Sequence, residues 1–177
     1  MDGEKLWAPW RAAYLRNLKQ KAADAGHQAP NIDNFLATYW QTPEKDQEHL
    51  VIHRNQHGMI LMNRFPYACG HLLIALGEPR PTLLDYDAHQ RQSFWQLIEL
   101  AMMLIHQTLG PQGINLGINE GTAAGAGLPE HLHGHLVPRW SGDTNFITVV
   151  GDVRVVPDSL ERMAQDYRQQ LVLLTNK

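Results

Sequence analysis

Apolar residues recur along this chain with two different periods, and the periods predict its helices and strands. Spacings of three and four predict helices near residues 7–18, 32–47, 88–109 and 160–174. Apolar runs and alternations bounded by turn residues predict strands at 50–54, 59–63, 70–76, 113–119 and from His131 to Val137–Pro138. Residues 19–31 are polar and small without an apolar period, which is typical of a loop or a disordered linker.

The order of these elements predicts the fold class. Five strands with hairpin-length links and one central helix, 88–109, favour an antiparallel α+β sheet. Asp87 and Gln90 suggest a capping box before the central helix, and Gly110-Pro111 ends it. Asp158 and Glu161 suggest a capping box at the start of the last helix. We expect residues 1–177 to form a single domain, with residues 1–31 as an N-terminal extension and linker.

The last predicted strand carries the most distinctive chemistry. His131, His133 and His135 occupy every second position, so a strand places their imidazoles on one face. One interpretation is a metal site, because neutral imidazole is a common zinc or copper ligand. The other is phosphate chemistry, in which one imidazole attacks phosphorus and its neighbours donate hydrogen bonds. Few carboxylates lie nearby to support a metal, and we therefore favour phosphate chemistry.

Composition narrows the class of protein further. The chain has 177 residues, 44% of them apolar, and a net charge of −3, which argues against a general nucleic-acid binder. Its single cysteine excludes an internal disulfide. The N-terminus lacks the pattern of a signal peptide, and no apolar run approaches a membrane span. We expect a cytoplasmic protein with no nucleic-acid or membrane partner.

A run of small residues lies between the fourth strand and the histidines. It spans Glu120–Gly127 and follows Asn119 directly. Glycine-rich loops can present backbone N–H groups to phosphate oxygens. Beside the histidine strand, this loop is therefore a candidate phosphate-binding segment.

Several motifs resemble those of one family. The pattern His-φ-His-φ-His-φ-φ at residues 131–137 resembles the signature of the histidine triad (HIT) superfamily of nucleotide hydrolases and transferases. Asn63-Arg64-x-Pro and Gly70-His71-Leu72 are similar to further motifs of that family. Pro138-Arg139-Trp140 resembles the bacterial branch that includes diadenosine tetraphosphate phosphorylases. The resemblance covers most of the chain and implies a HIT-like fold, an α+β five-stranded antiparallel sheet with one central helix and a C-terminal helix, paired into a homodimer.

The resemblance also implies roles for individual residues. His133 corresponds to the nucleophile that forms a covalent nucleotidyl-histidine intermediate, and His71, His131 and His135 orient it, bind the phosphate or assist the leaving group. Asn63 corresponds to a ribose ligand. The candidate ligands near the phosphates are Asn119, Gly125, Ala126, Gly127 and Arg139, and Trp140 is a candidate to stack near the substrate. For Arg139 a surface ion pair, and for Trp140 a place in the core, are equally good interpretations.

The sequence departs from the family pattern at three places, of which the change at Gly134 is expected only to adjust the packing. Residues 34–37 lack the Cys-x-x-Cys pair that binds zinc in many HIT proteins, so no such zinc site is expected. Gly134 replaces an apolar residue on the face away from the chemistry. Ala126 and Gly127 stand where the family usually has a Gln or Ser that contacts phosphate.

We therefore predict a HIT-family enzyme that cleaves an adenine nucleotide or dinucleotide at its α-phosphate. One alternative is a diadenosine tetraphosphate phosphorylase that releases ADP and ATP, and another is a nucleotide-binding module without turnover. A metal-binding protein is a further class, which we rank below these. We expect no required cofactor, apart from a divalent cation that the nucleotide substrate could bring with it.

Overall fold

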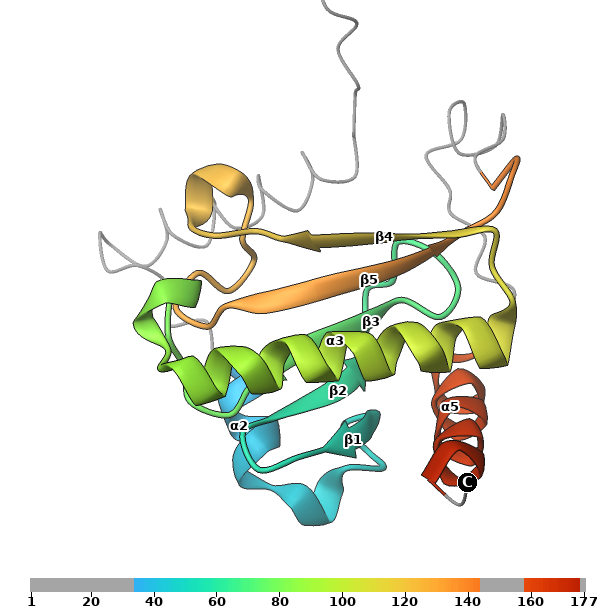
Figure 1. The fold of residues 1–177 in the computed structure, drawn as a ribbon, viewed down its shortest axis with the longest axis horizontal. Coiled ribbons are helices and arrows are strands. Elements are labelled where there is room, and N and C mark those ends of the chain that lie inside the picture. Colours follow the sequence, from blue (N-terminus) through green and yellow to red (C-terminus); the bar gives the residue numbers. More distant parts are fainter. Residues whose placement is uncertain (1–33, 144–157, 176–177) are drawn as a thin grey trace, which may run out of the picture. The chain divides into compact units, whose positions relative to one another are not determined.

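The five predicted strands form one antiparallel sheet in the computed structural model, which describes residues 34–143 and 158–175 (Figure 1). Their order across the sheet is β1-β2-β3-β5-β4. The bounds are β1 Val51–Arg54, β2 Gly58–Met62, β3 Leu72–Leu76, β4 Gly113–Ile118 and β5 His133–Arg139. The predicted fold class is confirmed, and each of the five strands lies within two residues of its predicted bounds.

Three α-helices accompany this sheet in the described residues. They are α2 Phe35–Gln41, α3 Ala88–Leu109 and α5 Leu160–Thr175, and short 3₁₀ turns are η1 Pro43–Lys45, η2 Leu83–Asp85 and η3 Thr122–Ala124. The helix α2 is shorter than the predicted 32–47, since Pro43 disfavours a helical conformation at Thr42. The predicted helix near residues 7–18 and the linker at 19–31 lie outside the described residues.

The central helix α3 has both ends that the sequence predicts. Asp87 accepts a hydrogen bond from the N–H of Gln90, whose side chain accepts one from the N–H of Asp87 in return. At the other end Gly110 adopts a left-handed conformation, with φ of 54°, and its N–H donates to the carbonyl of His106. This geometry closes the helix at a residue without a side chain.

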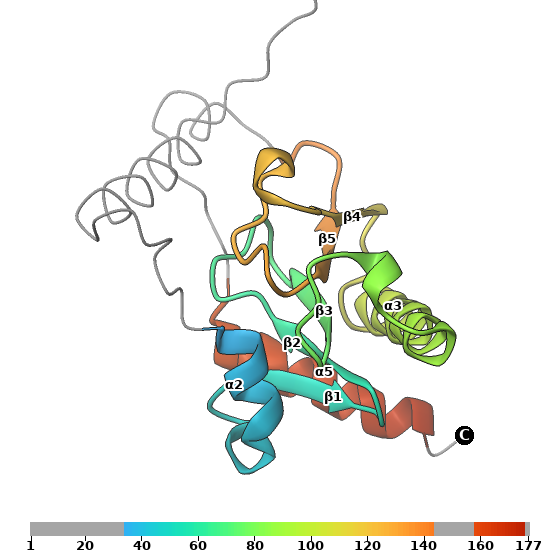
Figure 2. The same cartoon turned by 90° about the vertical axis from the view of Figure 1, so that its left-hand side faces the viewer.

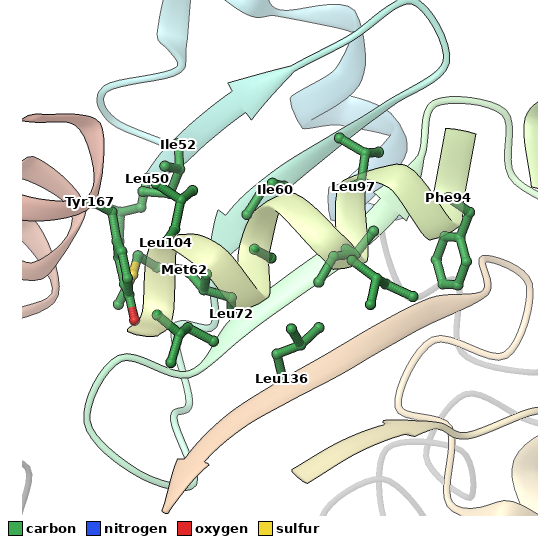
Figure 3. Close-up of a cluster of buried hydrophobic side chains, with 14 of the residues drawn as sticks. Leu50, Ile52, Ile60, Met62, Leu72, Phe94, Leu97, Leu104, Leu136 and Tyr167 are labelled. Atoms are coloured by element: carbon green, nitrogen blue, oxygen red, sulfur yellow. The ribbon is translucent and has the colours of Figure 1, made fainter. Parts of the chain in front are cut away.

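The hydrophobic core lies between the helices α3 and α5 and one face of the sheet (Figures 2 and 3). The helix α3 contacts β2, β3 and β5, while α5 contacts β1 and β2. Leu72, Ile74 and Leu136 belong to this core and are fully buried. Because side chains alternate along a strand, His133 and His135 point to the opposite face of the sheet. Packing of Leu136 in the core therefore fixes the position of β5, the strand that carries His133 and His135.

Two predicted boundaries are wrong in detail. The strand β5 starts at His133, not His131, and it continues through Pro138, which pairs with Ile114 of β4. Proline is tolerated there because β3 pairs with β5 only as far as Leu136, so Pro138 lies beyond that ladder. At the start of α5, the N–H of Arg162 donates to the hydroxyl of Ser159, so Ser159 and not Asp158 caps the helix.

Within the two described ranges, no helix is both long enough and apolar enough to cross a membrane.

Candidate active site

His133 is held in one tautomer by the main chain. Its Nδ1 lies 2.8 Å from the carbonyl oxygen of His131. A carbonyl can only accept, so Nδ1 carries the hydrogen and the neutral ring keeps its lone pair at Nε2. The side chain is only 7% exposed, and this burial lowers the pKa of His133 below the ordinary 6.5, partly offset by the hydrogen bond to His131. At neutral pH Nε2 is therefore unprotonated, with its lone pair available.

His131 is fully buried just before β5, and an oxygen faces each of its ring nitrogens. Nε2 lies 2.6 Å from the carbonyl oxygen of Leu76, at the end of β3. Nδ1 lies 2.9 Å from the side-chain oxygen of Asn34, which precedes α2. Burial lowers the pKa of His131, and the contact with the Leu76 carbonyl opposes this effect. These contacts hold the ring of His131, two residues before His133 in the chain.

A chain of hydrogen bonds runs from the β2–β3 loop to the third histidine of the triad. The N–H of Tyr67 donates to Nδ1 of His71, 3.1 Å away. Since this nitrogen accepts, a neutral His71 carries its hydrogen at Nε2, which lies 3.2 Å from Nδ1 of His135. His135 then carries its own hydrogen at Nε2. The chain makes His135 a hydrogen-bond donor at the nitrogen that is farther from His71.

Asn63 supports the same chain. Its side-chain oxygen accepts from the N–H of Phe65 at 2.9 Å, and its side-chain nitrogen lies 3.2 Å from Nδ1 of His71. The structure thus brings Asn63 to the histidines, but its polar side-chain atoms are engaged with protein groups in this conformation. A contact with ribose would require Asn63 to exchange or share these partners.

The loop that was predicted to bind phosphate begins level with His133. Ile118 of β4 pairs with Gly134, so Asn119 follows one residue beyond that pair. The N–H of Gly125 donates to the carbonyl of Thr122, and the N–H of Ala126 donates to the carbonyl of Gly121. The loop therefore folds on itself beside the histidines. These two N–H groups can reach a phosphate only if their internal bonds open, whereas Gly127 lies after them toward β5.

Gly134 has a packing role behind the histidines. It faces the core side of β5, where a Cβ atom would lie 3.2 Å from the ring of the fully buried Phe94 in α3. The absent side chain leaves room for this aromatic ring. The departure from the family pattern at Gly134 is thus compensated by Phe94 on the face away from the chemistry.

The structure does not bring Arg139 and Trp140 to the histidines. Arg139 lies six residues beyond His133 along an extended strand, about 20 Å away. Its guanidinium pairs with the carboxylate of Asp143, which raises the pKa of Arg139, and also donates to Asn115. Trp140 is half-buried next to this pair. Within the described part of one chain, Arg139 thus forms the surface ion pair that was the alternative interpretation.

Two contacts of the site were not anticipated from the sequence. Asn34 reaches His131 across 97 positions of the chain, and no local pattern predicts such a pair. The ring of Tyr67 stacks on that of His135, with centroids 5.8 Å apart and planes 13° from parallel. Tyr67 lies between the two motifs that carry Asn63 and His71, and that position was the signal available for it.

Metal ligands do not gather in the part of the chain that the structure describes. No group of three or more His, Cys, Asp or Glu side chains within residues 34–143 and 158–175 is placed to hold an ion. His71 and His135 bond to each other, and His131 and His133 bond to main-chain oxygens. Hydrogen bonds of this kind fix the orientation and the tautomer of an imidazole ring.

The fold and this arrangement of histidines define the class of protein, and the comparisons agree. The model of the HIT domain family matches residues 44–142, which is more than half of the chain. The chain belongs to the HIT family, and the prediction of a HIT-family enzyme is confirmed.

Particular relatives have named activities. The AP-4-A phosphorylase of Mycobacterium tuberculosis (strain CDC 1551 / Oshkosh) is 34% identical over 158 residues, which cover 89% of this chain and 78% of that protein. The bis(5'-adenosyl)-triphosphatase of Saccharomyces cerevisiae (strain YJM789) is 30% identical over 104 residues, 58% of this chain and 48% of that protein.

A solved structure shows the same fold. A Zn-bound histidine triad family protein from Mycobacterium smegmatis matches with a TM-score of 0.64 and 23% identity, covering 78% of this chain and 95% of that one. At this identity the likeness concerns the fold.

Proposed function

We propose that this enzyme cleaves an adenine dinucleotide polyphosphate at an α-phosphate through a covalent nucleotidyl-His133 intermediate. The observation that carries the proposal is the hydrogen bond from Nδ1 of His133 to the carbonyl of His131, which leaves Nε2 as a buried, unprotonated nucleophile. The names of the relatives, a phosphorylase and a triphosphatase of adenine dinucleotides, support this class of substrate.

The reaction has two displacements at phosphorus. In the first, Nε2 of His133 forms a bond to the α-phosphorus while the bond from phosphorus to the bridging oxygen breaks, and the remaining nucleotide leaves. His135 donates from its Nε2–H to the phosphate or to the departing oxygen. In the second, an acceptor oxygen attacks phosphorus, the P–N bond breaks and the His133 ring is restored. Splitting one difficult displacement into two lowers the barrier.

Inorganic phosphate is the second candidate acceptor, beside water. The phosphorylase relative supports it, since the match covers 89% of this chain. Transfer of AMP to phosphate yields ADP, whereas transfer to water yields AMP. The two acceptors thus give different products from the same intermediate.

Product analysis tests the function. The chain and its His133→Ala variant are incubated with diadenosine tetraphosphate, with and without inorganic phosphate, and the nucleotides are separated. Formation of ADP and ATP only with phosphate supports phosphorolysis, and formation of AMP and ATP without phosphate supports hydrolysis. A dinucleotide that binds but is never cleaved would instead support a binding module. Turnover that survives in the variant would contradict the nucleophile assignment.

We also propose a cytoplasmic homodimer that needs no resident metal. Among the described strands β4 is an edge of the sheet, and its Leu116 is 42% exposed. Trp95 and Met103 of α3 are 45% and 49% exposed. An edge strand and exposed apolar side chains support association with a second copy. Sedimentation of Leu116→Lys against the wild type tests the dimer. Activity after dialysis against a chelator, with and without added Mg²⁺, tests whether a divalent cation enters with the nucleotide.

A further inference from the structure

Asn34 connects the start of α2 to the first histidine of the triad. Its Oδ1 accepts a hydrogen bond of 2.9 Å from the N–H of Ala37 and so caps the helix. The same oxygen lies 2.9 Å from Nδ1 of His131. Because a main-chain N–H can only donate, the bond to Ala37 identifies this atom as the amide oxygen. In a hydrogen bond between this oxygen and His131, Nδ1 of His131 is therefore the donor.

The position of His131 makes this contact important for His133. His131 precedes the first paired residue of β5, and the β3–β5 ladder begins only at the pair of Ala75 and His133. The carbonyl of His131 is nevertheless the group that accepts from Nδ1 of His133. Orientation of the nucleophile therefore depends on a peptide group outside the ladder. The fully buried ring of His131 anchors that peptide group, because its one N–H in the neutral state donates to the carbonyl of Leu76 or to Oδ1 of Asn34.

We propose that Asn34 is a positioning residue of the active site, which holds the His131 ring and thereby the His131 carbonyl that orients His133. Only the kinetic consequence of this proposal rests on the proposed function. Asn34 touches no reacting atom and acts through His131. A loss of this contact lets the His131 peptide move, and small displacements of a nucleophile reduce the rate of its attack.

The contact has a spectroscopic consequence as well. A neutral imidazole carries one N–H and donates to one of the two oxygens, whereas the protonated ring donates to both. The Asn34 oxygen therefore favours the protonated form of His131 and opposes burial, which lowers its pKa. A second titratable group in the described residues, the nearby His133, also lowers the pKa of His131. Removing the oxygen lowers this pKa further, and replacing it by a carboxylate raises it.

Three variants separate the contact with His131 from the cap of α2. Asn34→Ser keeps a hydroxyl that can cap the N–H of Ala37, but the shorter side chain cannot reach His131. Asn34→Asp keeps an oxygen for both partners. The matched control is Asn55→Ser, since Asn55 likewise caps main-chain N–H groups, those of His57 and Gly58, and its own side chain bonds to these and to Ser93 rather than to a triad histidine. Each full-length variant is examined by steady-state kinetics with diadenosine tetraphosphate, by ¹⁵N NMR of the histidine rings and by thermal unfolding.

We expect Asn34→Ser to lower kcat by about tenfold with little change in KM, the size typical of lost outer-shell support. Asn34→Asp retains most of the wild-type kcat. The pKa of His131 falls in Asn34→Ser and rises in Asn34→Asp. Asn55→Ser lowers thermal stability but leaves kcat and the titration of His131 unchanged.

Wild-type kcat and an unshifted His131 titration in Asn34→Ser would overturn the proposal. So would equal losses of kcat in Asn34→Ser and Asn34→Asp that follow their losses of thermal stability, because Asn34 would then only cap the helix. If the wild-type chain turns over no dinucleotide, the proposed function has failed, and the NMR titrations of the same variants still decide whether Asn34 holds His131.

Discussion

The Nδ1 atom of His133 and the main-chain oxygen of His131 are 2.8 Å apart. The side chain of the second triad histidine thus bonds to the backbone of the first. Spacing by two residues has two effects here. It directs the side chains of His133 and His135 to one face of β5, and it places a carbonyl acceptor within reach of the His133 ring. The repeat therefore provides both the row of imidazoles and the orientation of one of them.

A covalent adduct on His133 is the first prediction. Rapid mixing of the chain with diadenosine tetraphosphate, followed by quenching in base, is expected to give a tryptic peptide containing His133 with one added adenylyl group. His133→Ala is expected to lower kcat by at least about 10³-fold, since it removes the nucleophile. Mass spectrometry checks the first result and steady-state kinetics the second.

The control is His106→Ala, a substitution at an exposed histidine in the last turn of α3. This variant should form the adduct normally. An adduct on another histidine, or none in a protein that turns over substrate, would contradict the assignment of His133.

The sequence predicts much of this fold because its periods are long and its end signals are strong. The helix α3 has a stripe of apolar residues over 22 positions, a capping box at Asp87 and a glycine at its end, and its predicted bounds agree with the structure. The histidine face of β5 follows from alternation alone. These features depend on residues that are close in the chain, and local physical rules therefore suffice.

The rest of the site depends on contacts between distant residues. The bond between Asn34 and His131, and the pairing of Arg139 with Asp143 instead of a position near the triad, follow from tertiary packing and side-chain geometry. No period in the sequence specifies them. The continuation of β5 through Pro138 was not predicted for a similar reason. Proline is tolerated at this position because the pairing of β3 with β5 ends at Leu136.

Loss of His71 should reduce the rate through His135. His71 donates from Nε2 to Nδ1 of His135 and so fixes the hydrogen of His135 at its other nitrogen. His71→Ala leaves the His135 tautomer free to change, and kcat should fall by about 10- to 100-fold with a smaller change in KM. Steady-state kinetics measure both constants, and ¹⁵N NMR reports the tautomer of His135. Unchanged kcat together with a wild-type tautomer would contradict the role of His71.

A side chain at Gly134 should destabilise the fold without touching the chemistry. In Gly134→Ala the new methyl group lies 3.2 Å from the ring of Phe94, which is fully buried and has little room to move. We expect the free energy of unfolding to fall by about 1–2 kcal/mol, as for other overpacked cores. Urea unfolding measures this change, while kcat at low temperature should stay close to that of the wild type.

The matched test of this clash is a second substitution. Phe94→Leu removes part of the ring that the new methyl group meets, so Gly134→Ala should cost less in a Phe94→Leu background than in the wild type. Equal costs in the two backgrounds would show that Phe94 is not the group that Gly134 accommodates.

Buried histidines should make the fold sensitive to acid. Burial lowers the pKa of His53, His131 and His133 below 6.5, so below that pH the unfolded chain binds more protons than the folded chain. Their contribution to stability is therefore complete above pH 6.5 and is lost as the pH falls through their lower pKa values in the folded state. Urea unfolding from about pH 7.5 down to about pH 5.5 should show the decline, and a smaller one in His133→Ala. Stability that rises on acidification, or the same slope in both proteins, would contradict the neutral, buried state of His133 on which its proposed role as a nucleophile depends.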